Sequence, residues 1–399
     1  MSTAEARNSS PWPAVIGVCG IYVSFGLAIG VMAPMVDEIT ADLGLTRSTM
    51  GSILGAWALI YVFTAVPAGA FVDRLGLRTS LTLGGLSITA SLLLRSVATS
   101  APSLFAAVAV FGIGGPLVSI ATPKLVASLF DEDSRRLPTG LGVASPAVGS
   151  ALALAGTNPV LLPVGGESWR RVLLMIAGVA FVTTLIWLFA SRAVTHVAQG
   201  ERSNRARLRR LLGLTSMRRI LTISLFSFFF AHALSNWLPE ILSDNGQSDN
   251  RSGYLAALSV TVGIAGALVI ARLVPSHRRP HALVVIFLVL TATVLGLSTL
   301  SFTPLVVSLA LLGFSRAGII PLLFLEIMGD PDIELEDIGA ATGLFFAVGE
   351  IGGFCGPYAV GYIADRTDGF ESATVALAGV CVAAAIPAWS LIKHSAFAR

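Results

Sequence analysis

The sequence predicts an all-α membrane protein in which twelve transmembrane helices form two six-helix halves. Three observations predict this fold. The 399 residues are 54% hydrophobic and 12% charged, with a mean hydropathy of +0.81, whereas soluble chains are about a quarter charged. Twelve apolar runs are each long enough to cross a bilayer, which takes about 20 helical residues. One long polar interruption divides these runs into six and six.

The first half is expected over residues 1–191. The breaks between its apolar runs contain charged residues, Gly or Pro, which favour turns outside the hydrocarbon core. The expected spans of this half are 13–36, 48–71, 79–98, 102–127, 138–160 and 169–191.

The polar interruption covers residues 192–219 and is expected to be a basic linker in the cytoplasm. It contains GERSNRARLRRLLGLTSMRR, in which Leu208, Leu211 and Leu212 follow helical spacing. Two interpretations stay open. The segment is either an amphipathic helix on an anionic membrane face or a solvated linker whose charge fixes the topology.

The second half is expected over residues 220–399. The break between residues 299 and 302 is weak, so the number of spans depends on whether the chain turns there. The expected spans, the first of which starts within the linker, are 217–240, 252–273, 281–299, 302–326, 337–362 and 373–392.

Basic residues predict the orientation in the membrane. With the N-terminus inside, most Lys and Arg residues of the loops and tails lie on one side, and the segment 192–219 is the richest of them. This asymmetry predicts a multi-pass protein of the cytoplasmic (inner) membrane with both termini in the cytoplasm. The N-terminal stretch lacks a charged region that leads to a small-residue cleavage site, so we expect the first run to be a retained span.

The stretch GAFVDRLGLRT at residues 69–79 places three charges between two apolar runs. Gly69 would allow a close helix approach, and Gly76 suits a turn that needs a positive φ. Asp73, Arg74 and Arg78 can form charge-assisted hydrogen bonds across the turn and to neighbouring helix ends. The stretch is therefore either a gate that stabilises one conformation or an ordinary basic turn.

This pattern, G-x-x-x-D-R-x-G-x-R after the second span, resembles the signature loop of the major facilitator superfamily. Trp169-Arg170 at the start of span six and GGFCGPYAVGYIADRTDG at 352–369 are similar to that family too. The resemblance implies the major facilitator fold, a secondary transporter with a central site and alternating access. The matching turn of the second half, ARLVPSHRRP, lacks the Asp, so a gate there would be weaker or built differently.

Short stretches also resemble the cyanate-permease and nitroimidazole-transporter branch of that superfamily. They are Leu92-Leu93-Leu94-Arg95-Ser96, Pro123-Lys124-Leu125-Val126 and Asn236-Trp237-Leu238-Pro239. The resemblance to this branch implies a substrate that is a small anion.

Charged residues deep in the spans are candidates for function, because a charge at mid-bilayer costs about 2.5–3.5 kcal/mol. Arg316 lies midway along span ten, and its planar guanidinium suits a carboxylate. It is either a substrate-binding residue or the structural ion-pair partner of Glu350 in span eleven. Burial disfavours the charged form of a carboxyl group, so Glu350 is a candidate proton carrier, and His232 in span seven is a second one.

Charges nearer the membrane surfaces suggest gates or anchors. Lys124 and Glu326 occupy matching places late in spans four and ten, near the inner face. They predict an ion pair that closes the cytoplasmic exit, although Lys124 could instead snorkel to the interface. We interpret Arg95, near the outer face, as an interfacial anchor.

Polar and aromatic residues of three spans could line a central cavity. The candidates are Tyr22, Trp57, Tyr61 and Asn236. Aromatic residues at such positions also serve as packing or lipid-facing groups. Asn236 is the strongest candidate, because an unpaired amide in an apolar medium is costly.

Several other functions are not expected. The sequence contains no G-x-x-x-x-G-K-[ST] loop for ATP and no H-E-x-x-H zinc motif, so we expect no enzyme activity, cofactor or metal. Its net charge of +3 gives no reason to expect nucleic-acid binding. The leading hypothesis is a monomeric secondary transporter of a small organic anion, driven by proton symport or exchange. The alternative is a proton-coupled exporter of drugs or amphipathic compounds.

Overall fold

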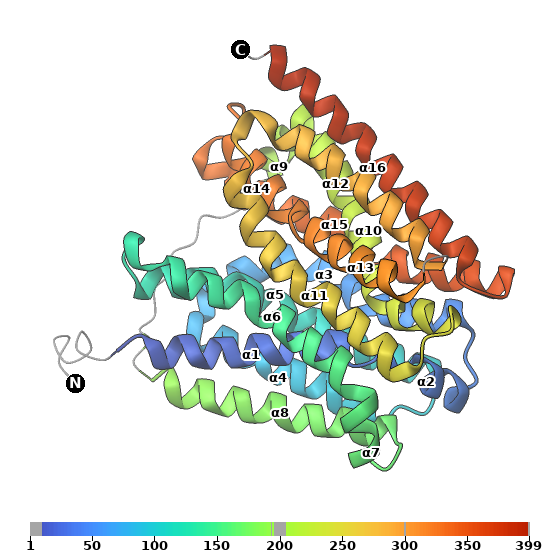
Figure 1. Ribbon diagram of the computed structural model, residues 1–399. Helices are drawn as coiled ribbons and strands as arrows, with labels where there is room; N and C mark the ends of the chain where they lie inside the picture. Colours follow the sequence, from blue (N-terminus) through green and yellow to red (C-terminus); the bar gives the residue numbers. More distant parts are fainter. Residues whose placement is uncertain (1–9, 193, 195–204, 299–300, 398–399) are drawn as a thin grey trace.

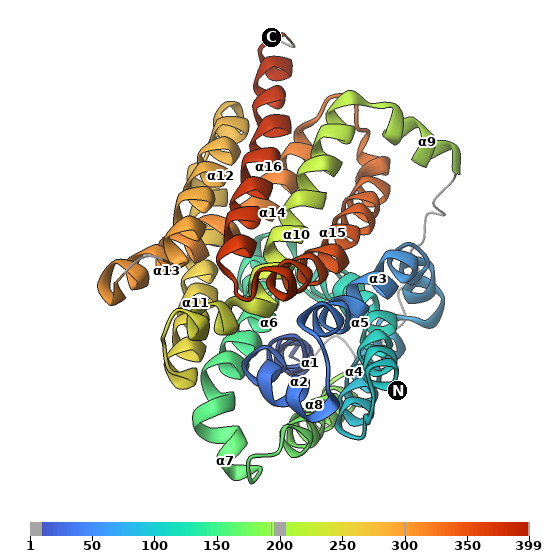
Figure 2. The same ribbon diagram turned by 90° about the vertical axis from the view of Figure 1, so that its right-hand side faces the viewer.

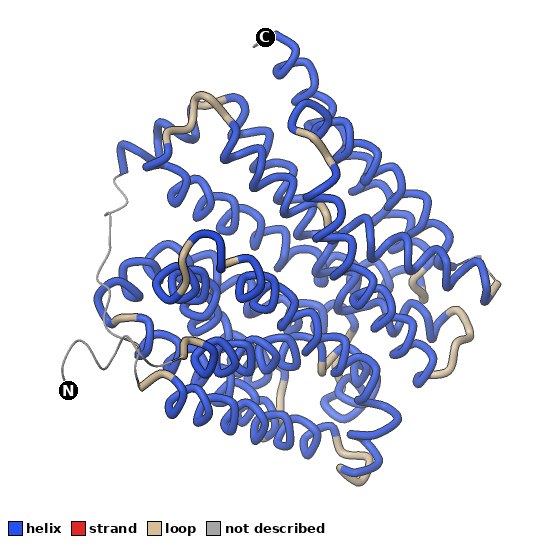
Figure 3. The backbone as a smooth tube through the Cα atoms, turned by 60° about the vertical axis from the view of Figure 1, so that its left-hand side comes forward, coloured by secondary structure: helices blue, strands red, loops and turns tan. Residues whose placement is uncertain are grey.

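The computed structural model describes residues 10–192, 194, 205–298 and 301–397. The described residues form helices joined by short loops and contain no strand, as Figure 3 shows. Twelve of these helices are long and apolar enough to cross a membrane, which confirms the predicted fold class. A helix satisfies its own backbone hydrogen bonds, so it can cross lipid where no water is available.

The first six spans are built from eight α-helices and two short irregular turns (Figure 1). They are α1 (Trp12–Gly30), η2 (Ala33–Met35) and α2 (Val36–Leu43) as span one, α3 (Arg47–Leu75), α4 (Leu77–Ser96), α5 (Ala101–Leu129), then α6 (Arg136–Gly156), η4 (Thr157–Leu161) and α7 (Leu162–Val164) as span five, and α8 (Trp169–Ala190).

The last six spans follow the same plan, with a break in the middle of span ten. They are α10 (Thr215–Asp244), α11 (Asp249–Leu273), η5 (Ser276–Arg278) with α12 (Arg279–Leu295), α13 (Phe302–Ala317) with α14 (Ile319–Gly329), α15 (Ile338–Thr367) and α16 (Glu371–Phe397). The chain leaves α12 at Leu295 and starts α13 at Phe302, so the weak break separates two spans.

Span one is longer than its apolar run predicts. It was expected to end at residue 36, but the helical path continues through α2 to Leu43 and stops where Gly44 adopts a φ of 61°. Asp37 and Glu38 lie in the first turn of α2, where the exposed amide groups of a helix favour carboxylates. Hydropathy therefore marked the membrane-embedded part of the span and missed its polar continuation.

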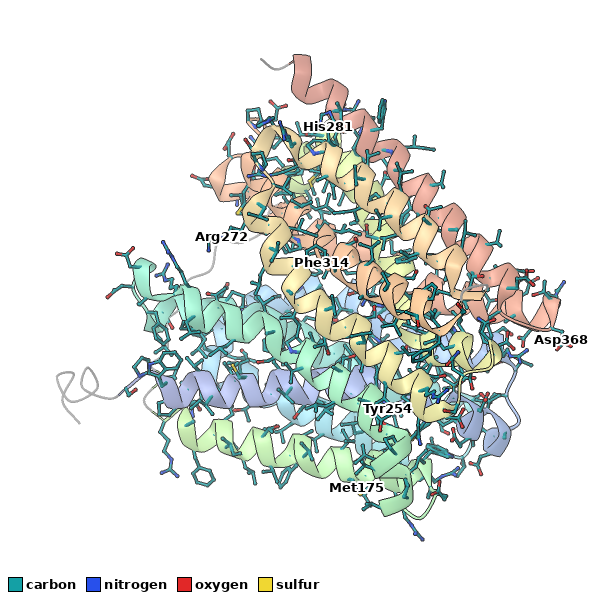
Figure 4. All side chains as sticks on the ribbon, in the orientation of Figure 1. Met175, Tyr254, Arg272, His281, Phe314 and Asp368 are labelled. Atoms are coloured by element: carbon teal, nitrogen blue, oxygen red, sulfur yellow. The ribbon has the colours of Figure 1, made fainter. Side chains whose placement is uncertain are left out.

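The two ends of the bundle differ in how the halves meet. We call the end where α1 and α10 begin the terminal end, and the end where α3 begins and α15 finishes the far end. At the far end α3 lies beside α15, and α6 beside α11. Figure 4 shows Asp368 at this far end, and His281 near the terminal end.

Helix α15 lies between α3 of the first half and α10 of the second (Figure 2). Glycine makes both contacts possible. A Cβ atom at Gly361 would collide with the carbonyl oxygen of Arg47 in α3, and one at Gly352 with that of Leu225 in α10. The close approach of backbones fixes α15 against both halves.

At the terminal end the two halves diverge, as Figure 1 shows. Gly69 lies at this end of α3, and a Cβ atom built there meets nothing within 4 Å. The close helix contact expected at Gly69 is therefore wrong for this conformation. Gly76, in contrast, has a φ of 79°, which confirms the expected turn with a positive φ.

Part of the predicted linker forms a helix, α9 (Arg205–Gly213), whereas residue 193 and residues 195–204 lie outside the described residues. Arg207 and Arg210 of α9 form ion pairs with Asp337, and Arg210 also pairs with Glu334 at 2.6 Å. Leu211 is fully buried. The basic face of α9 thus packs against the acidic loop before α15, an arrangement that neither interpretation of the linker included.

Candidate functional site

A cavity of about 430 Å³ lies between the two halves. Helices α1, α3 and α6 contribute to it from the first half, and α10, α11, α13 and α14 from the second. Most of its wall is apolar or glycine, and the polar lining side chains are Ser227, His232, Ser235, Asn236 and Arg316. All five lie on the second half, on α10 and α13.

Arg316 brings a positive charge to the cavity from the last turn of α13. Its Nη1 donates to the carbonyl oxygen of Ala231 at 3.1 Å and to the hydroxyl of Ser235 at 2.9 Å. Both partners lie on α10, so they orient the guanidinium without neutralising it.

Arg316 and Glu350 do not form an ion pair here, although the sequence left that possibility open. In the part of the chain that the structure describes, no carboxylate lies within ion-pairing distance of Arg316. An uncompensated guanidinium in a membrane cavity is able to bind an anion through the edge that is not bonded to α10.

Glu350 lies behind the cavity wall and faces His232. The side chain of Glu350 is 5% exposed, and its Oε2 lies 3.7 Å from Nε2 of His232. Neither Oε2 of Glu350 nor Nδ1 of His232 has a hydrogen-bond partner among the described residues. A buried carboxyl beside an imidazole, both incompletely bonded, is suited to binding and releasing a proton.

Gly353 provides the space for this pair. It follows Glu350 by about one helical turn, and a Cβ atom there would lie 2.6 Å from Oε2 of Glu350 and 2.8 Å from Nδ1 of His232. Any side chain at this position would therefore displace one of the two titratable groups.

His232 also connects the two halves. Its ring stacks on Trp57 of α3 with the centroids 5.0 Å apart, and on Phe228 of α10 at 5.7 Å. Trp57, Phe228 and His232 all line the cavity. His232 thus lies between the cavity and Glu350, on the path that a proton exchanged between them would take.

The other predicted cavity residues divide into two groups. Asn236 lines the cavity, and its amide donates to the carbonyl oxygen of His232 at 2.8 Å. Tyr22 and Tyr61 are absent from the lining: the ring of Tyr22 packs on Phe25 of its own helix, and the ring of Tyr61 lies beside Trp57 and Phe346. The structure thus brings Arg316, His232, Trp57 and Asn236 together and leaves the two tyrosines apart.

The predicted gate residues lie at the terminal end, within their own halves. Asp73 pairs with Lys124 at 2.5 Å, linking α3 to α5. Arg78 donates to the carbonyl oxygen of Leu188 on α8 at 3.2 Å, while Arg74 is exposed. Glu326 lies on α14 in the other half, so the predicted pair between Lys124 and Glu326 is not formed in this conformation.

Two other residues differ from expectation or were missed. Arg95 is 2% exposed and donates to the carbonyl oxygen of Ala28 at 2.8 Å, so the interfacial anchor predicted for it is wrong. Asp365 was not singled out. Its carboxylate accepts from the backbone amides of Arg47 and Ser48 at 3.0 and 2.8 Å, which caps α3 of the opposite half. The Asp-Arg pair after span eleven, similar to Asp73-Arg74, was the available signal.

Two six-helix halves around a central cavity are the architecture of a membrane transporter. The chain belongs to the Major Facilitator Superfamily, whose family model matches residues 18–330.

Relatives across most of the chain are transporters. The uncharacterized transporter YycB of Bacillus subtilis is 22% identical and aligns with 90% of this chain and 88% of its own length. The D-galactonate transporter of Escherichia coli O6:H1 is 23% identical over 88% of both chains. The gallate transporter of Pseudomonas putida is 24% identical, over 76% of this chain and 75% of its own.

A solved structure has the same fold. It is a bacterial homologue of the human lysosomal transporter Spinster in an inward-facing, unoccupied conformation. The two chains superpose with a TM-score of 0.78 at 13% identity, over 97% of this chain and 98% of the other.

Proposed function

We propose that this protein is a secondary active transporter that moves a small organic anion across the cytoplasmic membrane by alternating access, coupled to protons by symport or exchange. The observation that carries the proposal is the guanidinium of Arg316, which lines a cavity between the halves without a carboxylate partner among the described residues. Two relatives named for organic acids, D-galactonate and gallate, support an anionic substrate.

In this proposal Arg316 binds the anionic group, and Asn236 and Trp57 contact the rest of the substrate. Tyr22 and Tyr61 remain predicted contributors that would have to act in another conformation. Glu350 carries the coupling proton, and His232 connects it to the cavity.

The contacts at the far end and the divergence at the terminal end support a conformation open toward the terminal end. We propose that this end faces the cytoplasm, so that both termini are cytoplasmic and the protein is caught open to the inside. Asp73, Arg74, Arg78, Lys124 and Glu326 would then stabilise the opposite conformation when the halves close over them.

The finer assignments stay predictions. They are the division into residues 1–191, 192–219 and 220–399, the monomeric state, and the cyanate-permease and nitroimidazole-transporter branch.

The test is uptake of labelled organic anions into proteoliposomes, with and without an inward proton gradient, corrected with protein-free vesicles for leak of the undissociated acid. Because Lys lacks the planar fork of Arg, Arg316→Lys should weaken uptake by about tenfold or more, since bonds between charged groups contribute about 1.5–3 kcal/mol. Arg251→Lys, at the exposed start of α11 and outside the cavity lining, is the matched control. Normal uptake by Arg316→Lys would refute the anion-binding role.

A second candidate is a proton-coupled exporter of drugs or amphipathic compounds, and the largely apolar cavity wall favours it. Transport assays in inverted membrane vesicles, with a proton gradient imposed across the membrane, distinguish the anion transporter from the exporter. Movement of an amphipathic cation such as ethidium that does not depend on Arg316, without movement of any anion, would support the exporter.

A further inference from the structure

We infer that the transported anion is a planar, largely apolar monocarboxylate of the size of a single aromatic ring, and not a polyhydroxylated acid or a dicarboxylate. This inference rests on the proposed function and narrows its substrate class. It follows from how polar and apolar groups are divided between the two walls of the cavity.

The cavity has one polar wall and one apolar wall. The five polar lining side chains lie on α10 and α13. The described lining of the first half consists of Ile29, Trp57, Gly140, Val143, Ala144, Pro146 and Ala147, in which the indole N–H of Trp57 is the one side-chain hydrogen-bonding group. A bound molecule is therefore best accommodated with its charged end toward the second half and a largely apolar surface toward the first.

Much of the polar wall is already hydrogen-bonded. Ser235 and the carbonyl of Ala231 hold one nitrogen of Arg316, and the amide of Asn236 is bonded to its own helix. Among the described lining residues, the hydroxyl of Ser227 and Nδ1 of His232 have no partner. A carboxylate can use the free edge of Arg316, but a molecule with several hydroxyls would leave most of them unpaired against the apolar wall.

The cavity also lacks a second fixed cation in its described lining. His232 is the other titratable lining residue, and it faces the carboxyl of Glu350. A second carboxylate on the substrate would enter an apolar wall or approach Glu350, and either position is unfavourable.

Small side chains on two neighbouring helices leave a slot for a ring. Gly140, Ala144 and Ala147 follow helical spacing on α6, and Gly263 and Ala267 do so on α11, which packs beside α6. Trp57 and Phe228 add aromatic surface to the same cavity. Flat apolar walls of this kind suit the face of an aromatic ring.

Binding to the purified full-length protein in detergent tests the inference without interference from membrane leak. Isothermal titration with benzoate, gluconate and adipate should give an affinity for benzoate that is higher by about tenfold or more than for the other two. Val143 of α6 lines the cavity. Val143→Thr keeps the shape of the side chain but places a hydroxyl on the apolar wall. It should reduce the ratio of the affinities for benzoate and gluconate several-fold. Val148→Thr, on the same helix outside the lining, should leave the ratio unchanged.

Each outcome separates this inference from the proposed function. Gluconate or adipate binding as tightly as benzoate, with that binding lost in Arg316→Lys, would overturn the substrate class and keep an anion transporter. Binding of benzoate that is unaffected by Arg316→Lys would refute the orientation that the inference requires. If none of the three anions binds, both the inference and the anion proposal fail.

Discussion

At the scale of single residues, the two ionisable groups deep in spans ten and eleven occupy separate places. Arg316 faces the cavity, and Glu350 lies behind His232 in the wall. Because each charge in the membrane is costly, we expect each to have a use, and their separation agrees with the proposal that one binds the anion and the other carries the proton.

Replacing Glu350 with Gln should separate transport from proton coupling. The amide keeps the shape of the side chain but cannot lose or gain a proton at neutral pH. We expect Glu350→Gln to exchange labelled for unlabelled anion at the wild-type rate and to lose accumulation driven by a proton gradient.

Paired measurements of counterflow and gradient-driven uptake in the same proteoliposomes check this expectation. Glu371→Gln, at the exposed start of α16, is the control and should retain both activities. Accumulation that persists in Glu350→Gln would remove Glu350 from the coupling mechanism.

Gly353 offers a stability test of the same site. In Gly353→Ala the added methyl would press on Glu350 and His232, so we expect a loss of about 1–3 kcal/mol of stability, typical of overpacking. Gly379→Ala on α16, where a Cβ atom meets nothing within 4 Å, should instead be neutral or stabilising by up to about 1 kcal/mol. Thermal unfolding in detergent measures both, and equal melting temperatures would contradict the tight packing at Gly353.

Sequence reasoning found the residues of this site by their depth and could not predict their partners. The position of Arg316 and Glu350 along their apolar runs gives their height in the membrane. Which way each side chain points depends on the rotation of its helix, and that depends on packing against neighbours. For this reason the contact of Arg316 with α10, the position of His232 beside Glu350, and the absence of Tyr22 and Tyr61 from the cavity lining were not predictable.

At the scale of elements, α15 is the helix that contributes most to the closed far end. It packs on α3 and α10 through glycine contacts, carries Glu350 at mid-length, and ends at the carboxylate that caps α3. A change in the hydrogen bonds at its end should therefore alter the balance between conformations.

Asp365, whose carboxylate accepts these hydrogen bonds, is the residue to replace in a test of this expectation. Loss of a helix cap costs about 0.5–2 kcal/mol, and in this structure the cap exists because the far end is closed. Asp365→Ala should therefore shift the population toward the conformation that is open at the far end, by about fivefold for 1 kcal/mol. Asp365→Asn should have a smaller effect, since Asn is also a good cap.

Distances between spin labels placed on the two halves at the far end would report this shift. An unchanged distance distribution in Asp365→Ala would show that the cap does not contribute to closure.

The helix α9 shows which properties of an element can be predicted from the sequence and which cannot. Leucine spacing left a helix within 192–219 open as one of two interpretations, and α9 forms there. Its docking on Glu334 and Asp337 depended on a loop more than a hundred residues away in sequence, so local charge could not reveal it.

At the scale of the whole molecule, the structure shows one conformation of a protein proposed to have two. The far end is closed by α3 with α15 and α6 with α11, while Lys124 and Glu326 stay in separate halves. In the opposite conformation these two residues should approach each other.

A disulfide cross-link tests this movement. In a variant without Cys19, Cys355 and Cys381, Lys124→Cys with Glu326→Cys should cross-link slowly, because the terminal ends diverge in the conformation described here. Adding Asp365→Ala should raise the cross-linking rate, since opening the far end closes the terminal end. Absence of cross-linking under all conditions would refute the predicted approach of these two positions.

Composition and the arrangement of apolar runs were sufficient for the fold class, because lipid permits few structures other than helices. They could not predict the conformational state. Both conformations of an alternating-access protein use the same spans, and the difference lies in contacts worth a few kcal/mol.

The division of the cavity into a charged wall and an apolar wall has a consequence for evolution and engineering. Mutations in α6 or at Trp57 can change the apolar wall that would contact the organic part of the substrate. They leave the ionisable side chains on α10, α13 and α15 unchanged. New transport specificities should therefore arise most readily in the N-terminal half, and mutagenesis libraries that aim to redirect this protein should be concentrated there.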